Sequence, residues 1–416
     1  MSDQRYSIRP YEHDRDQEEV DRIYREVGWL GSSVPKARAE QRERFARDSV
    51  SFVAEINNTP ECYAATFPGT YCYHGHDLAF SGVASVITSR IARKQGLASR
   101  LTARAVAQSA LDGAVISGLG MFDQGFYDKL GYGHGAYDTY VMLDPANLNV
   151  PHCRRVPVRL SAEDAEEMHA ARLTRLRRHG AVSLATSATT ALMARRTDAA
   201  FGLGFRDDSG TLTHHIWVNP DGGSGPYRVL WMAYSNLAQF VELLGLLRNL
   251  GDQVYLVRLV EPGGVQLQDF LDRPFRRHAE AKGGRYETYS SAVANFQYRI
   301  LHVTKAFAAV STGERLDATL RVVDPIEKYL INSTWPGVAG DYAISLARES
   351  RAEAIKGKRE GGIDISADVG TLTRLWLGVL PASTLRGIRA LECTEEMAST
   401  LDSIFYRGLP HTDWSY

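Results

Sequence analysis

The stretch R-K-Q-G-L-A at residues 93–98 has the composition of an anion site. It follows a strand-like run at residues 77–89 and opens a helical pattern at residues 96–111. The first amides of a helix lack partners within the helix and lie at its positive end, where a phosphate can accept their hydrogens. Gly96 allows close approach of the backbone, and Arg93 and Lys94 add charge. The alternative is a solvated glycine turn, but the order strand, loop, helix favours a phosphate cradle.

The strand before this cradle ends in Val86, Ile87 and Thr88. Its free backbone amides could bind the amide-rich arm of a cofactor. One of them could also stabilise a carbonyl oxygen that gains negative charge during acyl transfer. The side chains of Val86 and Ile87 are those of an ordinary core strand, so only the backbone need take part.

A second chemical candidate lies in F-Y-D-K-L-G-Y-G at residues 126–133. A phenol has a pKa near 10 and a thiol about 8.5, so Tyr127 keeps its proton at neutral pH and can donate it to a leaving thiolate. The alternative role for Tyr127 is that of a half-buried packing residue.

The elements that must position these residues fall into three regions, which is also what 416 residues suggest at about 150 residues per domain. Residues 1–145 predict two helices, three successive strands, the helix after the cradle and further short strands. Residues 146–295 repeat the order helix, three strands, helix, strand, without an R-x-x-G-x-A stretch. Residues 296–416 begin with the strand-like F-Q-Y-R-I-L-H-V and continue as an α+β pattern. The predicted fold class is therefore α/β and α+β, with mixed sheets in the first two regions.

Composition excludes several classes of protein. Lys plus Arg is 48 and Asp plus Glu is 49, which leaves a formal net charge of −1 and no basic footprint for nucleic acid. No apolar run reaches the ~20 residues of a membrane span, and the N-terminus is too polar for a signal peptide. Four separated cysteines are typical of reduced thiols, so we expect a cytoplasmic protein. The histidines show no metal-ligand spacing, so no metal is expected.

These motifs together resemble the GNAT superfamily of acyl-CoA N-acyltransferases, whose pyrophosphate motif is Q/R-x-x-G-x-G/A. The sequence is still more similar to the enhanced intracellular survival (Eis) family. That resemblance implies a catalytic GNAT domain at 1–145, a GNAT-like domain without the cofactor motif at 146–295, and a sterol-carrier-protein-like domain at 296–416. It also implies acetyl-CoA as co-substrate and a homo-oligomer, possibly a hexamer.

The resemblance assigns roles residue by residue. Tyr127 would be the general acid, and Phe122 and Asp123 would lie near the cofactor thiol. The acetyl-CoA site would otherwise comprise Val86, Ile87, Thr88, Arg93, Lys94, Gln95, Gly96, Leu97, Ala98 and Ser99. Gln95 stands where relatives often carry a basic residue. Ser85 is a small residue directly before Val86. At this place the family can have an aromatic residue that shapes the amine pocket.

In the Eis family the general base is the C-terminal carboxylate, here that of Tyr416. A free α-carboxylate has a pKa of about 3.3–3.7, and burial in an apolar pocket raises the pKa. Trp414 and Tyr416 could anchor the tail, the alternative being a frayed terminus. Asp413 could attract a cationic amine or could simply be a solvated acid.

The expected activity is transfer of an acetyl group to a primary amine, such as an aminoglycoside, a polyamine or a lysine side chain. Two alternatives stay open. The protein could bind a lipid or other hydrophobic ligand through its third region, with a vestigial GNAT domain. It could also be an acyltransferase that uses a different acyl-CoA.

Overall fold

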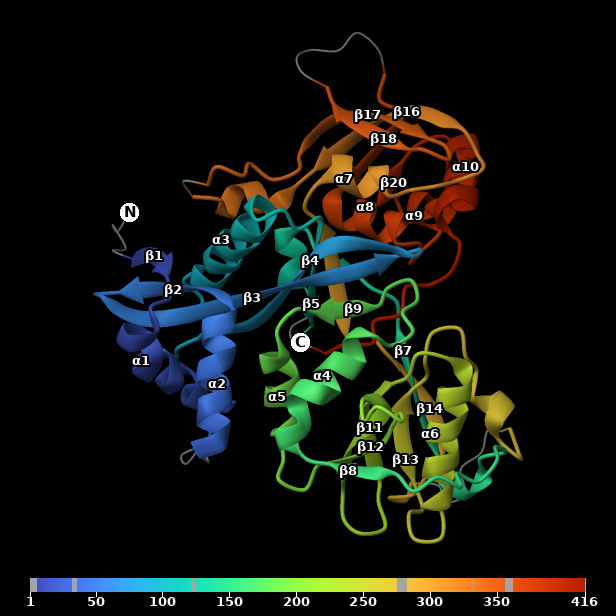
Figure 1. Cartoon of the computed structure of the whole chain (residues 1–416). Helices are drawn as coiled ribbons and strands as arrows, with labels where there is room; N and C mark the ends of the chain where they lie inside the picture. The colour runs from blue at the N-terminus through green and yellow to red at the C-terminus, as the bar shows by residue number, and fades with distance from the viewer. Residues whose placement is uncertain are drawn as a thin grey trace.

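The computed structural model describes residues 6–31, 36–121, 125–274, 283–331, 333–355 and 362–415. These residues form three β-sheets, one associated with each region of the chain. In Figure 1 the first region is blue to teal, the second green to yellow, and the third orange to red. The C-terminus lies centrally where the regions meet, whereas the N-terminus lies at the outer edge of the first region.

The first region begins with a strand and two helices and then forms the strands that flank the cradle. Its elements are β1 (Tyr6–Pro10), α1 (His13–Glu26), α2 (Lys36–Asp48), β2 (Val50–Ile56), β3 (Thr59–Tyr73), β4 (His76–Thr88), α3 (Leu97–Leu111), β5 (Ile116–Gly120), the 3-10 helix η1 (Tyr127–Leu130) and β6 (Gly133–His134). Asn57 and Asn58, and later His74 and Gly75, have positive φ and make the tight turns between β2, β3 and β4. Both turns were predicted from these residue types.

The second region repeats part of this order. Its elements are β7 (Asp138–Leu143), η2 (Pro145–Asn147), β8 (Val158–Leu160), η3 (Ala162–Asp164), α4 (Ala165–Leu173), β9 (Val182–Leu184), α5 (Ser187–Ala194), β10 (Phe201–Arg206), β11 (Leu212–Pro220), β12 (Tyr227–Ala233), α6 (Leu237–Asn249), β13 (Val257–Val260), η4 (Leu267–Phe270) and β14 (Tyr289–Val293). The first α-helix of this region, α4, is short. It ends at Leu173, because the guanidinium of Arg175 turns back to donate to the carbonyls of Arg172 and Val182.

The third region carries a smaller sheet and the last helices. Its elements are β15 (Phe296–Ile300), α7 (Val303–Ala308), β16 (Leu316–Val323), η5 (Pro325–Tyr329), β17 (Gly340–Leu346), β18 (Arg351–Ala354), β19 (Ile365–Asp368), α8 (Val369–Trp376), α9 (Ala382–Gly387), β20 (Leu391–Glu392) and α10 (Glu395–Phe405). The strand order of its sheet is β18-β17-β16-β19-β20.

The first two sheets are built on the same plan. In the first, the order is β1-β2-β3-β4-β5-β15-β6, and α3 connects the parallel strands β4 and β5. In the second, the order is β14-β7-β13-β12-β11-β10-β8, and α6 connects the parallel strands β12 and β13. Each helix is thus the crossover that a parallel pair requires. The expected fold class, two GNAT-like mixed sheets followed by a sterol-carrier-like α+β region, is confirmed.

The two sheets also exchange strands. β7 was expected to complete the first sheet, but it pairs with β13 and β14 in the second. β15 was expected to open the third domain, but it lies between β5 and β6 in the first sheet. β9 also leaves the second region to pair with β3. An alternating apolar pattern identifies a strand but does not determine which strand it pairs with. The strands that pair with β7 and β15 lie far away from them in the sequence.

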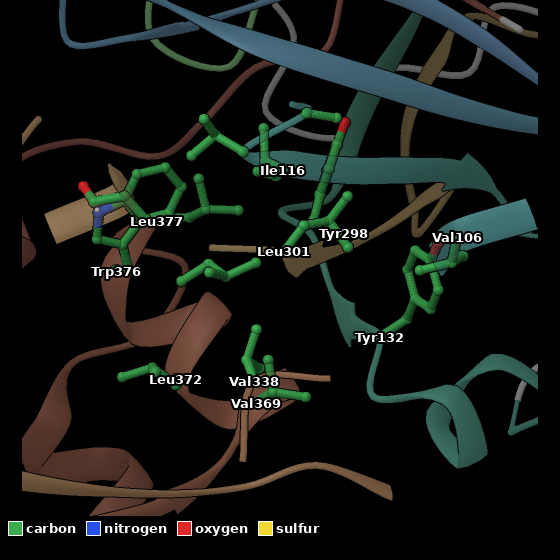
Figure 2. Close-up of a cluster of buried hydrophobic side chains, with 14 of the residues drawn as sticks. Val106, Ile116, Tyr132, Tyr298, Leu301, Val338, Val369, Leu372, Trp376 and Leu377 are labelled. Atoms are coloured by element: carbon green, nitrogen blue, oxygen red, sulfur yellow. Dashed lines mark hydrogen bonds between the residues drawn. The ribbon is translucent and has the colours of Figure 1, made fainter. Parts of the chain in front are cut away.

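One apolar core joins the first and third regions. Figure 2 shows Val369, Leu372 and Trp376 of α8 close to Tyr298 of β15 and Ile116 of β5. The ring of Tyr73 stacks on Trp376 with centroids 4.1 Å apart, and its hydroxyl donates to the Trp376 carbonyl. The two regions therefore behave as one packed body at this contact.

A buried ion pair reinforces that junction. Arg299 of β15 donates to Asp324 over 2.7 Å, and both side chains are fully buried. Asp324 also accepts from the amides of Ile326 and Val338, so its charge is well satisfied.

Among the helices that the structure describes, none is long and apolar enough to cross a bilayer.

Candidate active site

The predicted phosphate cradle lies at an open helix start. α3 begins at Leu97, and Gly96 at its N-cap has φ +78° and no capping side chain among the described residues. A Cβ on Gly96 would meet no atom within 4 Å, so the space in front of the amides is clear. Arg93 and Lys94 are exposed beside it, and Ser99 is buried behind it. The first α3 amides are therefore available to an anion.

The loop before α3 is held where it leaves β4. The Glu26 carboxylate at the end of α1 accepts the Arg90 amide over 2.7 Å, and the Ser89 amide donates to the backbone carbonyl of Glu61 on β3 over 2.9 Å. The Gln95 side chain takes part in the turn itself: its Nε2 donates to the Ile91 carbonyl over 2.8 Å and stiffens the turn. The sequence offered no signal for the role of Glu26, because its partner lies 64 residues away.

The strand that feeds the cradle is bulged and then loses one neighbour. Ser85 has φ +56°, and the pairing with β3 slips there, since Tyr63 faces Ile87 but Ala65 faces Ala84. On the other side, pairing with β5 stops at Val83. Within the described residues, the stretch from Ala84 to Thr88 thus has a strand partner on the β3 side alone. This leaves alternate backbone groups of Val86, Ile87 and Thr88 open toward a ligand.

The matching helix of the second region is closed in the same place. Asn236 caps α6, because its side-chain oxygen accepts from the Gln239 amide over 3.0 Å. At the start of α6 the Asn236 side chain accepts a backbone amide hydrogen. At the start of α3 the corresponding hydrogen would be available to a phosphate. The start of α6 thus differs from the start of α3, where Gly96 provides no capping side chain.

Tyr127 lies in η1 and is buried, with 7% of its surface exposed. Its ring meets the edge of Phe126 at 4.8 Å and Tyr132 at 6.1 Å between centroids. The Tyr132 hydroxyl bonds to Ser117 of β5 over 2.8 Å, and burial raises the pKa of Tyr132 to about 12. Phe122 and Asp123 lie outside the described residues.

The C-terminal tail is docked rather than frayed as far as the structure describes it. The Asp413 carboxylate receives two hydrogen bonds from Arg175, at 2.7 and 2.5 Å, and one from the Val182 amide at 3.2 Å. Trp414 is 1% exposed and lies over Arg172. The predicted anchoring by Trp414 is confirmed. Tyr416 lies outside the described residues, and Ser415 is the last residue before it.

A cavity of about 340 Å³ opens beside the tail. It lies where the end of β5 meets the second sheet, at the point where β12 and β13 separate after Arg228 and Arg258. Its lining comes from all three regions: Gly120, Met121, Asp138, Tyr140, Arg175, Leu176, Arg178, Ala181, Val229, Leu230, Trp231, Met232, Tyr234, Leu259, Val260, Pro262, Gly263, Asn295, Phe296, His411, Thr412, Asp413, Trp414 and Ser415. Of the predicted site residues that the structure describes, only Asp413 is in this wall.

Most of this lining was missed by sequence reasoning. The Arg-rich run at 172–178 was visible, but nothing in it indicated a cavity. Within the described part of the chain, no group of three or more His, Cys, Asp or Glu side chains could hold a metal ion.

The two carboxylates of the cavity have opposite protonation tendencies. Burial raises the pKa of Asp138, although Asn295 donates to it over 2.6 Å and opposes the shift. Burial would also raise the pKa of Asp413, but the Arg175 guanidinium outweighs this and lowers it. Pairing with Arg175 therefore favours the ionised form of Asp413, whereas burial moves the titration of Asp138 to higher pH.

Comparison with known families decides what this arrangement is. Residues 13–135 match the family model of the acetyltransferase (GNAT) domain, and residues 303–412 match that of the sterol carrier protein domain. This chain carries a GNAT acetyltransferase domain. It is an acyltransferase, and the GNAT fold implies that the acyl group comes from an acyl-CoA. The open start of α3 lies inside the matched GNAT segment, and the docked tail lies at the end of the sterol-carrier match.

Solved structures share the fold over the whole chain. An Enterococcus faecalis protein described as a probable N-acyltransferase has a TM-score of 0.79 at 18% identity, with 99% of both chains covered. A GCN5-related N-acetyltransferase from Anabaena variabilis has a TM-score of 0.78 at 15% identity, covering 99% of this chain and 100% of that one. Eis1 from Mycobacterium abscessus has a TM-score of 0.76 at 15% identity, with the same coverage. No curated protein matches the sequence.

Proposed function

We propose that this GNAT enzyme transfers the acetyl group of acetyl-CoA to a primary amine. The observation that carries the proposal is the uncapped start of α3 at Gly96, placed beside the point where β4 leaves β5. A pyrophosphate would accept the first α3 amides, with Arg93 and Lys94 adding charge. The acyl-bearing arm would lie along Val86, Ile87 and Thr88, where backbone groups of β4 are no longer paired with β5.

The reaction we propose is direct attack. The amine nitrogen forms a bond to the thioester carbonyl carbon, and a backbone amide near Ile87 or Thr88 stabilises the oxyanion. The carbon–sulfur bond then breaks, and Tyr127 gives its proton to the departing thiolate. The Tyr416 carboxylate takes the proton lost by the amine, directly or through water. Burial of Tyr127 supports its assignment, because a shielded phenol stays protonated at neutral pH.

The acceptor would bind in the cavity beside the tail. Ser415 lines that cavity, and the next residue in the chain is Tyr416, whose carboxylate is the proposed base. Ser85 at the bulge and Asp413 in the wall are the proposed acceptor-side residues. Asp413 also has a structural part here, because its pair with Arg175 holds the tail.

The decisive experiment removes Ser415 and Tyr416. Turnover, followed as release of free CoA thiol, should be lost, whereas acetyl-CoA affinity by calorimetry should stay within about twofold, since the cradle is untouched. Full activity of the truncated enzyme would refute the base assignment. Absence of acetyl-CoA binding by the full chain would instead favour the alternative in which the third region binds a lipid. Turnover across acyl-CoAs of increasing length tests the choice of donor.

A cytoplasmic location and a homo-oligomer, possibly a hexamer, stay predictions from the sequence. Measuring the mass in solution by light scattering tests the second of these.

A further inference from the structure

The cavity beside the tail offers a cationic substrate no free carboxylate among its described lining residues. The Asp413 charge is matched by the two hydrogen bonds from Arg175. Asp138 is 5% exposed and accepts from Asn295 over 2.6 Å, and burial raises its pKa. A polycation such as an aminoglycoside would therefore find the Asp413 charge already paired and the Asp138 carboxyl almost covered.

One guanidinium group of the wall, by contrast, is exposed. Arg178 is exposed in the cavity wall, and no carboxylate of the described residues forms an ion pair with it. It packs on the backbone at Gly264, where φ is +71° and a Cβ would come within about 3.0 Å of the guanidinium carbon. A side chain at position 264 would displace Arg178, so the glycine keeps the guanidinium in its place.

A second guanidinium lies just behind the wall. Arg172 is 4% exposed and donates a hydrogen bond to Thr190 over 3.0 Å. No carboxylate of the described chain pairs with it. It lies 3.7 Å from the ring centroid of Trp414 and 4.6 Å from that of Trp231, both of which line the cavity.

Three aromatic rings of the cavity wall already contact guanidinium groups of the protein. Arg172 occupies Trp231 and Trp414, and Arg258 lies 4.2 Å from the centroid of Tyr140 on the same wall. An aromatic lining often binds cationic amines through cation–π contacts. Here the protein's own cations take those contacts and add repulsion toward a further positive charge.

From the exposed Arg178 guanidinium and these internal cation–π contacts we infer that the acceptor is a primary amine that also carries an anionic group, and that Arg178 is the residue that selects for it. The inference rests on the proposed function, because it assigns the acceptor of that same reaction. Arg178 would bind the carboxylate of an amino-acid-like substrate with its planar pair of donors. The amine at the other end would then lie toward the end of β5 and Ser415, across the cavity.

The test compares two acceptors that differ in one charge, β-alanine and β-alaninamide, at saturating acetyl-CoA. The wild-type enzyme should show the higher kcat/KM with β-alanine, and this advantage should shrink as salt rises. Arg178→Gln should raise the KM for β-alanine by about tenfold to a hundredfold, the usual effect of losing a hydrogen bond between charged groups. Its kcat/KM for β-alaninamide should be unchanged. Arg178→Lys should recover part of the difference.

Arg154→Gln is the matched control, because Arg154 is an exposed arginine of the same region outside the cavity lining. It should leave both acceptors unaffected. Equal or better turnover of β-alaninamide, or of the polycation spermidine, by the wild type would overturn the inference while leaving the acetyltransferase proposal intact. So would an Arg178→Gln enzyme slowed equally with both acceptors, because Arg178 would then serve the Tyr416 carboxylate instead. Failure of every amine together with absent acetyl-CoA binding would refute the proposed function itself.

Discussion

Trp414 in the C-terminal tail lies over the guanidinium of Arg172 on α4, with 3.7 Å between the guanidinium carbon and the ring centroid. The indole is almost fully buried, and the edge of His169 meets it at 5.4 Å between centroids. This stack and the neighbouring ion pair between Arg175 and Asp413 fix the tail on the second region. The tail thereby becomes one wall of the cavity beside β5.

Trp414→Ala should release the tail. Truncating a buried tryptophan costs about 3–5 kcal/mol, enough to undock a short segment without unfolding the domains. We expect kcat to fall at least tenfold while acetyl-CoA affinity by calorimetry is kept. Tyr406→Ala is the control, because Tyr406 is a large aromatic near the tail with 49% of its surface exposed. A Trp414→Ala enzyme with normal kcat would show that the tail is not needed for turnover.

Gly96→Ala should weaken acetyl-CoA binding about tenfold or more. The new Cβ would enter the clear space before the α3 amides and displace the phosphate. This would weaken the hydrogen bonds that these amides donate to the charged phosphate oxygens. Gly113→Ala is a matched control, since Gly113 also has positive φ and open surroundings but lies at the other end of α3. Both variants should lose about 1–2 kcal/mol of unfolding free energy from backbone strain. Equal acetyl-CoA affinities in the two variants would contradict the cradle assignment.

Tyr127→Phe should lower kcat by about 10²–10⁴ if the phenol is the general acid. The ring keeps its contacts with Phe126 and Tyr132, so little change in folding is expected. Tyr132→Phe removes a neighbouring hydroxyl that bonds to Ser117, and it should cost about 1 kcal/mol of stability with kcat unchanged. An unaltered rate in Tyr127→Phe would return Tyr127 to a packing role.

His215 makes folding stability depend on pH. It is fully buried, its Nε2 accepts from the Trp231 indole over 2.9 Å, and burial lowers its pKa to about 3. Between pH 6.5 and 3 the unfolded chain binds a proton that the folded one does not, so stability falls as pH falls, by about 1.4 kcal/mol per pH unit for one such group.

His215→Gln keeps an acceptor for the indole and does not titrate. Urea denaturation of this variant should therefore show a weaker loss of unfolding free energy between pH 6.5 and 5 than the wild type. His76→Gln, at an exposed histidine that is the first residue of β4, serves as control and should keep the wild-type profile. Parallel profiles for wild type and His215→Gln would mean that His215 is protonated in the folded protein.

Much of the donor half of the site could be predicted from the sequence. R-K-Q-G-L-A is local: strand, loop and helix are consecutive, so residue types alone indicate an open helix start at Gly96. The role of Gln95 could not be predicted in the same way, because its choice between a phosphate and the Ile91 carbonyl depends on how the turn closes.

The acceptor half could not be predicted, for a different physical reason. Its wall joins Asp138, Arg178, Trp231 and the tail, which approach one another only because β7 and β15 change sheets. Asp413 illustrates the difference, since its residue type suggested attraction of a cation. Its partner Arg175, 238 residues earlier in the chain, takes that charge.

The sequence by itself determined the three-part plan, the GNAT resemblance and the place of the phosphate cradle, because these depend on local periodicity and on motifs of a few adjacent residues. Only the tertiary structure decided which strands pair, where the tail docks and what charge the cavity presents. Those properties arise from contacts between segments hundreds of residues apart, and burial and pairing in such contacts set whether a carboxylate or a guanidinium is free to bind a substrate.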